Sequence, residues 1–322
     1  MTLARSVRGV AAGAGVLALF MTAATGTQAQ ARHAHAKPAV AIGKPQYVGG
    51  AGGVYYRNMV VVLTWHDVEP KGVYDTISTA NFSAQMQALK TDGFHVVAPS
   101  ALAPFLAGKR PVPDNAVLLT FDNGTEGVYQ NALPVLRRYR YPILLFPIFG
   151  RTGVHSDFLT ASQLKALVAT GFVTLGSHTY QEHNAIAVGP SQTQPADVGF
   201  EWNGKTHESL SHYEARVTRD AALAQANIKR YQGRPEPYFS DPFGQYTPLL
   251  LREIAKEGFT LDFTTFGWAA TPGSPADRIP RINVGTGAST ASSMVGAILT
   301  VASDTAKDPS LYPPVSHVIT WR

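Results

Sequence analysis

The chain has 322 residues, of which 45% are hydrophobic and 15% are charged, with a formal net charge of +5. This length and apolar content suit one large domain or two small ones, with a well-filled core. The absence of cysteine excludes disulfides and thiolate chemistry, and the scattered distribution of Lys and Arg argues against a nucleic-acid partner.

Residues 1–31 have the pattern of a secretory signal peptide. Arg5 and Arg8 precede an apolar stretch rich in Gly and Ala, and the sequence AQA at 29–31 offers a cleavage site. A membrane anchor is the alternative, but the stretch is short for a bilayer span. We therefore expect a secreted, periplasmic or cell-envelope protein with no stable membrane span after cleavage. Residues 32–57 should form a flexible lead-in, because they begin with an aperiodic polar segment that contains Pro.

From residue 58 onwards, strand-like and helix-like segments alternate. The Val-rich run 59–68 predicts a strand, and 78–93 predicts a helix capped by Ser78 or Thr79 and ended by a Gly. Pro134 predicts a kink or break in the next long helix. The remaining predicted elements are strands at 95–99, 116–121, 142–150, 172–178, 237–244 and 259–266, and helices at 128–140, 160–171, 213–233 and 247–258. A polar stretch at 184–211 separates two of them.

This alternation without a repeat predicts a parallel sheet, either open or closed into a barrel. Parallel α/β folds place their functional sites at the carboxyl ends of the strands. Polar residues occur at four predicted strand ends, namely Trp65-His66-Asp67, Phe121-Asp122-Asn123, Ser177-His178 and Ser240-Asp241. We expect these four ends to line one cleft.

Two local patterns suggest chemistry at this cleft. In VLLTFDNGTEG, a buried strand ends in Asp122 and Asn123, although Asp122 could also be a turn-forming residue before Gly124. His178 and His183 are five residues apart, which on one helix would separate their side chains by about 140°. They can converge if one ends a strand and the other lies on the following loop. Two convergent imidazoles suit zinc or a related divalent ion, whereas ordinary surface or core histidines are the alternative.

Several motifs, taken in order, resemble those of the polysaccharide deacetylases, which are carbohydrate esterase family 4 and share the NodB-homology domain. LLTFDNG resembles the family's T-F-D-D-G, and SHTYQEH resembles the longer second motif of the branch that deacetylates poly-N-acetylglucosamine. The segment ending in FSDPFGQY matches the approach to the third motif. RIPRINV resembles the end of the domain, and VLTWHDVEP resembles its start in the same branch. The resemblance covers roughly residues 58–285, which leaves 286–322 as a C-terminal extension that packs on the barrel.

The resemblance implies an α/β fold, a distorted (β/α) barrel of the NodB-homology type with seven strands and one divalent metal ion, zinc being favoured. It places Asp122 as the general base and His66 as the general acid, in preference to His317 near the C-terminus. The metal positions fall on Asn123, His178 and His183, and Asn123 stands where the family has a carboxylate. We further expect the substrate to contact Asp67, Tyr180, Asp241 and Trp268, although Asp67 and Asp241 could equally serve only to hydrogen-bond their neighbours.

These expectations combine into one hypothesis: an exported, metal-dependent N-deacetylase that acts on an N-acetylglucosamine-containing cell-envelope polymer or exopolysaccharide. Amide hydrolysis needs an activated nucleophile, stabilisation of the oxyanion and a proton for the leaving amine, which a metal, a carboxylate and an imidazole can supply. Two alternatives remain open. Asn123 favours a glycan-binding relative without turnover, and the same fold could also hydrolyse another amide or an ester.

Overall fold

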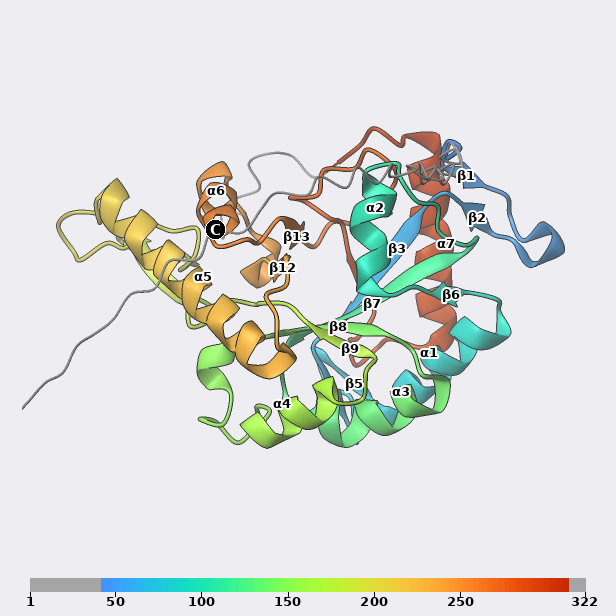
Figure 1. Ribbon diagram of the computed structural model, residues 1–322, viewed down its shortest axis with the longest axis horizontal. Helices are drawn as coiled ribbons and strands as arrows, with labels where there is room; N and C mark the ends of the chain where they lie inside the picture. The colour runs from blue at the N-terminus through green and yellow to red at the C-terminus, as the bar shows by residue number, and fades with distance from the viewer. Residues whose placement is uncertain (1–41, 313–322) are drawn as a thin grey trace, which may run out of the picture. The chain divides into compact units, whose positions relative to one another are not determined.

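The computed structural model describes residues 42–312 (Figure 1). Every described residue belongs to one structural unit, Ala39–Arg322. The predicted signal peptide at 1–31 and the alternative acid His317 lie outside the described residues.

A parallel sheet forms the centre of this unit. Its strand order is β14 (Ile282–Asn283), β3 (Val60–Trp65), β7 (Ala116–Asn123), β8 (Ile143–Pro147) and β9 (Val173–Leu175). All neighbours in this order are parallel, and the short β6 (His95–Val96) pairs with the start of β7. β3, β7 and β8 were predicted from continuous apolar runs, as expected for strands that are buried on both faces, and β9 was also predicted, whereas the two-residue β14 was not.

Two further strands continue this sheet around the molecule. β12 (Tyr238–Ser240) and β13 (Leu261–Phe263) pair in parallel with each other. A single parallel bridge joins Ser177, just beyond β9, to Phe239 in β12, and another joins Phe263 in β13 to Ile279, just before β14. The parallel strands thus follow one another in an interrupted ring, β3-β7-β8-β9-β12-β13-β14, as in a distorted barrel of seven strands.

Helices lie along the outer side of the strands (Figure 1). α1 (Thr79–Thr91) packs against α3 (Leu133–Tyr139) and α7 (Ala291–Lys307), while α5 (Leu210–Gln232) packs against α4 (Ala161–Val168) and α6 (Pro248–Lys256). The predicted N-cap of α1 is confirmed, since the Ser78 side chain accepts a hydrogen bond from the backbone N–H of Asn81. The predicted irregularity near Pro134 takes the form of a π-helical turn at Val128–Ala132 that runs directly into α3, with Pro134 in the first turn of the α-helix.

The core has two parts because alternate residues of each strand face opposite sides. In β3, Val61 and Leu63 pack under the outer helices, whereas Val60 and Val62 face the inside of the ring. The inner part is completed by Leu118, Leu144, Phe146, Phe263 and the short helix α2 (Leu102–Leu106). Burial on both sides fixes the register of the strands, and with it the position of the side chains at their carboxyl ends.

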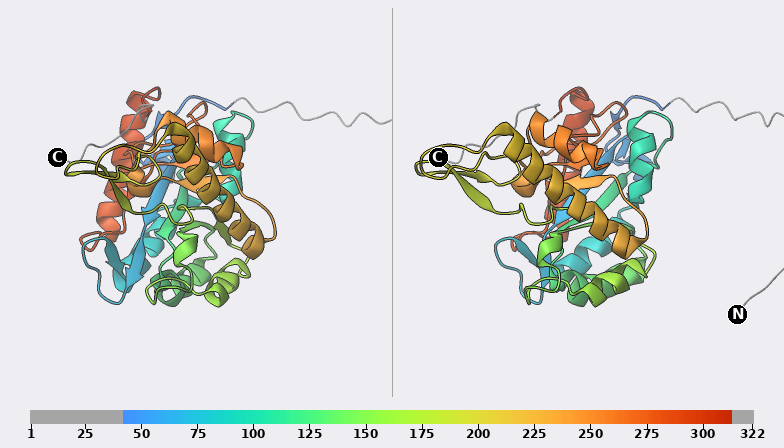
Figure 2. Two further views of the ribbon diagram at one scale, coloured as in Figure 1. Left: turned by 90° about the vertical axis from the view of Figure 1, so that its left-hand side faces the viewer. Right: turned by 60° about the vertical axis from the view of Figure 1, so that its left-hand side comes forward.

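Other segments are additions to the barrel. β1 (Gln46–Tyr47) and β2 (Tyr56–Arg57) form an antiparallel pair within the predicted lead-in, so this part of it is ordered and buries Tyr56. β4 (Asp67–Glu69) and β5 (Thr76–Ser78) follow β3. Within the polar stretch 184–211, β10 (Ala185–Gly189) and β11 (Gln192–Pro195) form a hairpin that projects beside the start of α5 (Figure 2).

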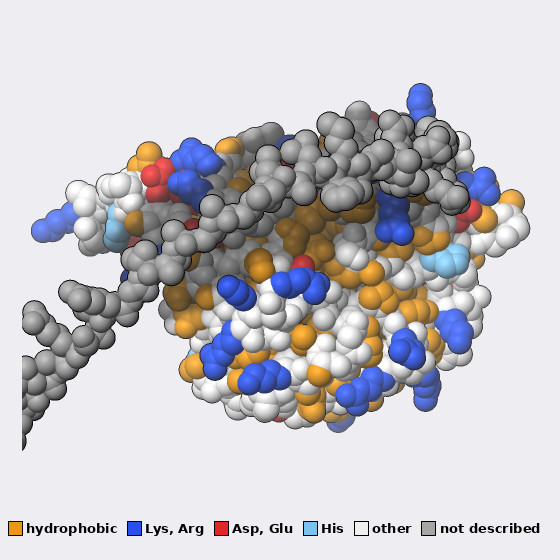
Figure 3. Space-filling view, in the orientation of Figure 1, with side chains coloured by type: hydrophobic (Ala, Val, Ile, Leu, Met, Phe, Trp, Pro, Cys, Tyr) orange, Lys and Arg blue, Asp and Glu red, His pale blue; other side chains and the backbone are white. Residues whose placement is uncertain are grey.

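Two further observations concern the charged side chains on the surface and the length of the helices. On the face shown in Figure 3, Lys and Arg side chains are dispersed among apolar and uncharged ones. Across residues 42–312, no helix combines the length and apolar character needed to cross a membrane.

Candidate active site

The polar residues expected at the strand ends do meet at one edge of the barrel. β3 ends at Trp65 and is followed by His66, and β7 ends in Asp122 and Asn123. His178 follows β9, and Ser240 ends β12. Contacts link these ends directly: His178 Nδ1 lies 2.8 Å from the carbonyl oxygen of Ser240, whose hydroxyl donates to Asp122 Oδ2 over 3.2 Å.

Asp122 is held in a buried ion pair with Arg281. The carboxyl group is 2% exposed, and Arg281 donates to it twice, from Nη1 to Oδ1 over 2.8 Å and from Nη2 to Oδ2 over 2.9 Å. Burial alone would raise the pKa of Asp122, but the charges of Arg281 and His178 and the hydrogen bonds from Arg281 hold the pKa well below its usual range. Asp122 is therefore a carboxylate throughout the neutral range, with a fixed orientation.

Arg281 is the main functional residue that sequence reasoning missed. It lies just before β14, inside RIPRINV, and it is 2% exposed. Its Nη1 also approaches the hydroxyls of Thr64 and Thr120, each at 3.3 Å, and Nη2 donates to the Ser240 hydroxyl over 2.8 Å. An arginine that leads directly into a strand of the central sheet is rarely buried unless it is paired. That position was the available signal.

The two histidines converge, as predicted. Their ring centroids are 4.5 Å apart, with His178 at the end of the β9 segment and His183 on the following loop. His178 Nδ1 faces a carbonyl oxygen and must therefore carry the proton, which leaves its Nε2 free to act as a ligand. Burial lowers the pKa of His178 to about 3 and that of His183 to about 4. Both imidazoles are neutral near pH 7, as metal ligation requires.

Asn123 occupies the third predicted metal position. Its backbone is left-handed, with φ of 68°, and its Oδ1 is buried with no hydrogen-bond partner among the described residues. Across residues 42–312, no three His, Cys, Asp or Glu side chains are arranged to hold a metal ion. The resemblance offers Asn123 Oδ1, a buried acceptor without a partner among the described residues, as the third ligand. Two neutral imidazoles and one amide oxygen fit a divalent cation by atom type, but they bring it no negative charge.

His66 stands beside this cluster and has a carboxylate partner. Its Nδ1 lies 3.4 Å from Oδ1 of Asp75, which belongs to the segment between β4 and β5 and was not predicted. The Thr125 hydroxyl donates to the carbonyl oxygen of His66 over 3.1 Å and so ties the end of β3 to the end of β7. The His66 side chain is 22% exposed, which leaves it accessible to a ligand.

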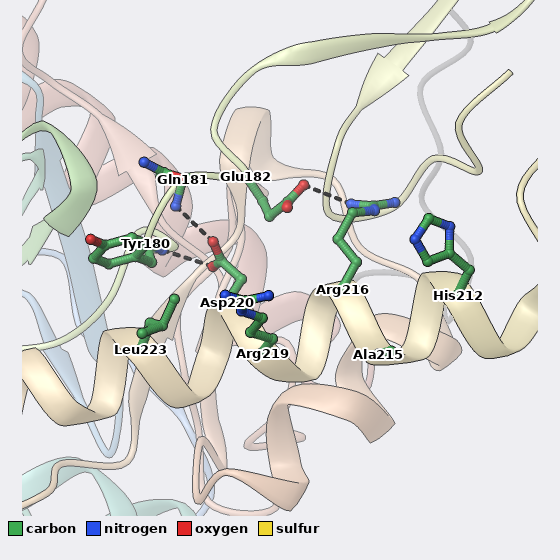
Figure 4. A pocket seen from close by; sticks show the side chains of 9 residues that line it. All are labelled: Tyr180, Gln181, Glu182, His212, Ala215, Arg216, Arg219, Asp220 and Leu223. Atoms are coloured by element: carbon green, nitrogen blue, oxygen red, sulfur yellow. Dashed lines mark hydrogen bonds and ion pairs between the residues drawn. The ribbon is translucent and has the colours of Figure 1, made fainter. Parts of the chain in front are cut away.

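The loop that carries both histidines is fixed from outside by α5. The carboxylate of Asp220 accepts hydrogen bonds from the backbone N–H groups of Tyr180 and Gln181, each over 2.7 Å (Figure 4). Next to it, Arg216 pairs with Glu182 over 2.6 Å. Sequence reasoning did not identify Asp220, because nothing in the local sequence of α5 indicates which loop this residue contacts.

The four predicted substrate contacts have different surroundings. Asp67 Oδ1 accepts a hydrogen bond from the Val68 N–H over 2.8 Å, and burial raises its pKa to about 6. Tyr180 lines a cavity of about 680 Å³ along α5 together with Asp220 (Figure 4). Trp268 packs against Phe266, with ring centroids 6.3 Å apart. No hydrogen bond, ion pair or ring contact among the described residues joins Trp268 to the histidines or Asp122.

The expected substrate contact by Asp241 does not agree with the structure. Asp241 is 1% exposed, so its carboxyl group has no surface to offer a bound sugar. Its carboxyl group instead lies close to that of Asp262, which is also buried. This burial favours the alternative, in which Asp241 interacts only with its neighbours in the protein.

Comparisons with known proteins identify the family. Residues 109–261 match the family model for polysaccharide deacetylase. The chain is 25% identical over 247 residues to the poly-beta-1,6-N-acetyl-D-glucosamine N-deacetylase of Escherichia coli K12, an alignment that covers 70% of this chain but only 36% of that protein.

Solved structures of deacetylases are also similar to this chain. IcaB from Ammonifex degensii superposes with a TM-score of 0.62 and 30% identity, covering 76% of this chain and 97% of that one. A de-N-acetylase from Aggregatibacter actinomycetemcomitans shares the fold, with a TM-score of 0.68 and 22% identity over 74% of this chain and 99% of that one. Family model, sequence identity and fold point the same way, and the chain belongs to the polysaccharide deacetylase family.

Proposed function

We propose that this protein is a metal-dependent N-deacetylase that removes acetyl groups from an N-acetylglucosamine-containing polysaccharide outside the cytoplasm. The observation that carries the proposal is the meeting of a paired carboxylate, two ligand-ready imidazoles and an accessible histidine at the carboxyl ends of the barrel strands. The names of the relatives support the substrate class, since the E. coli relative is named for poly-beta-1,6-N-acetyl-D-glucosamine. The signal-peptide pattern at 1–31 supports export.

Each protein group has a defined task in this reaction. Asp122 takes a proton from the attacking water, whose oxygen adds to the acetyl carbonyl carbon. Arg281 fixes both carboxylate oxygens, so the base keeps one orientation. When the C–N bond breaks, acetate leaves and the amine nitrogen takes a proton from His66. Asp75 Oδ1 lies 3.4 Å from His66 Nδ1, on the side of the ring away from Nε2, and would help to orient the imidazole for this step.

The site would bind its ion through Asn123, His178 and His183. A divalent ion held there would act as a Lewis acid toward the acetyl carbonyl oxygen. The ring of His178 is held in place by its hydrogen bond to Ser240, and the backbone of His183 is held by Arg151, whose Nη2 donates to the His183 carbonyl oxygen over 2.8 Å. The protein therefore contributes a pre-oriented but uncharged set of ligands.

Amine release from N-acetylglucosamine oligomers, measured with added divalent metals, tests the proposal. We expect release above that of Asp122→Asn, which keeps the shape of the site but removes the base. Equal, background-level release from both proteins would refute deacetylation.

The rival function is glycan binding without turnover, which the uncharged ligand set at Asn123 favours. Oligomer binding by calorimetry, together with no amine release at any metal concentration, would establish this rival. Release of acetate from a simple ester but not from the oligomer would instead show a different hydrolase on the same fold.

A further inference from the structure

A second cavity lies directly beside His183. Its volume is about 300 Å³, and it is lined by Ala185, Thr193, Gln194, Pro195 and Phe243. Four of these residues belong to the β10–β11 hairpin, whereas Phe243 comes from the turn after β12. The Phe243 ring centroid is 4.8 Å from that of His183, with 36° between the ring planes. The cavity and the candidate metal site therefore adjoin each other across these two rings.

Phe243 combines backbone strain with exposure. Its φ of 56° is in the left-handed region, which costs a bulky residue on the order of 1–3 kcal/mol. The following Gly244 is also left-handed, and a Cβ there would lie 1.7 Å from Thr265 Oγ1, so the turn is pressed closely onto its neighbour. Despite this constraint the Phe243 side chain is 46% exposed. A strained turn that holds a large apolar ring in the solvent is characteristic of a ligand contact.

The hairpin supplies the opposite wall of the cavity. Its base is fixed, because Arg216 donates to the carbonyl oxygens of Ala196 over 2.7 Å and Gly199 over 3.0 Å. Within residues 42–312, neither the Thr193 hydroxyl nor the Gln194 carboxamide takes part in a hydrogen bond. The cavity thus has one aromatic wall and one rigidly mounted wall with free hydrogen-bonding groups. A pyranose ring matches this arrangement, since it has an apolar C–H face and hydroxyl or acetamido groups at its edge.

We propose that Phe243 and the β10–β11 hairpin form a binding subsite for the sugar residue next to the one that loses its acetyl group. The Phe243 ring stacks on the apolar face of an N-acetylhexosamine unit, and Thr193 and Gln194 bind its polar edge. The inference rests on the proposed function, because it takes the occupant to be part of the same polymer. It gives a role to the strained turn next to His183 and to the hairpin.

Binding of N-acetylglucosamine monomer and pentamer, measured by calorimetry on the full chain, tests this subsite. Phe243→Ala should weaken pentamer binding about tenfold and leave monomer binding unchanged, because only the longer ligand reaches the second position. Phe243→Trp should restore affinity, and Phe243→Leu should not, because it keeps apolar contact with His183 but lacks a flat ring. Gln194→Ala should also weaken the pentamer selectively.

Tyr47→Ala is the matched control, since Tyr47 is a 40%-exposed aromatic residue on β1. It should leave both affinities unchanged. Equal pentamer affinity in Phe243→Ala and wild type, with amine release intact, would overturn the subsite but not the proposed function. No pentamer binding by the wild type would overturn both. A loss of monomer and pentamer affinity to the same extent would overturn the subsite by showing a general disturbance of the His183 region.

Discussion

In the proposed site, metal affinity should depend most directly on Asn123. Its amide oxygen can coordinate a cation but adds no charge to the two neutral imidazoles. Asn123→Asp should therefore tighten metal binding about tenfold or more and raise amine release, because a carboxylate supplies the missing charge. Metal titration and amine release check this result. If the wild type already matches the variant in both, the amide is a harmless replacement; peptide masses should accompany the test, since Asn before Gly is prone to deamidation.

The buried pair of Asp122 and Arg281 makes a second prediction at the same scale. Arg281→Met should destabilise the fold by about 3–5 kcal/mol near pH 7, because it leaves a buried carboxylate without its partner. The depressed pKa of Asp122 gives the wild type a contribution that is constant above the unfolded value near 4. Without Arg281, burial should raise the pKa of Asp122, so the folded variant takes up a proton and regains stability as the pH falls toward 4. The difference between variant and wild type should therefore shrink toward acid pH.

Urea unfolding between pH 4 and 7 measures this difference. The double variant Asp122→Asn/Arg281→Met is the control, and it should recover most of the lost stability because no buried charge remains. A double variant as unstable as Arg281→Met would show that the guanidinium acts through packing against Phe146 and not through its charge.

At the scale of the element, α5 fixes the loop at 179–183, which carries His183, because Asp220 accepts hydrogen bonds from Tyr180 and Gln181. Asp220→Asn keeps the size of the side chain but can accept only one of the two hydrogen bonds from the loop, because its NH₂ group is a donor. We expect faster amide hydrogen exchange at residues 179–183 and metal binding weaker by about tenfold. Both readouts are independent of turnover.

Glu253→Gln is the matched control for Asp220. Glu253 is a buried carboxylate on the adjacent α6, and it accepts a hydrogen bond from Thr218 of α5 over 3.0 Å. Its replacement should lower stability without changing exchange in the loop. Equal exchange at 179–183 in both variants would show that Asp220 merely stabilises α5.

The elements also show what a sequence can and cannot reveal. β3, β7 and β8 were predictable because burial on both faces leaves an apolar run, and α1 and α4 because their caps are local. The β10–β11 hairpin was not predictable from the sequence, because its exposed face carries Gln, Ser and Thr without regular alternation. Of the site, the convergence of the histidines was predictable from one short motif. Arg281 pairs with a residue 159 positions away, and no local pattern contains that information.

At the scale of the whole molecule, buried carboxyl groups should determine how stability varies with pH. Asp197, Asp241 and Asp262 are at most 2% exposed, and the oxygens of Asp197 have no partner among the described residues. Burial, followed by the charge of neighbouring acids, raises the pKa of Asp197 and Asp241 well above the usual range, and burial raises that of Asp262 to about 7. These groups are protonated in the folded protein at pH values where the unfolded chain has lost the protons.

The sign of the effect follows from this difference in bound protons. A raised pKa stabilises the fold below the unfolded value, and the stabilisation is lost as pH rises through the folded value. His178 and His183 act the other way, but only below their unfolded pKa near 6.5, because above it they are neutral in both states. The metal-free protein should therefore lose about 2 kcal/mol of unfolding free energy between pH 6.5 and 8.5. Urea unfolding followed by tryptophan fluorescence measures this loss. Asp262→Asn should flatten the dependence, whereas Asp304→Asn at the surface should not, and stability that rises over this range would contradict the prediction.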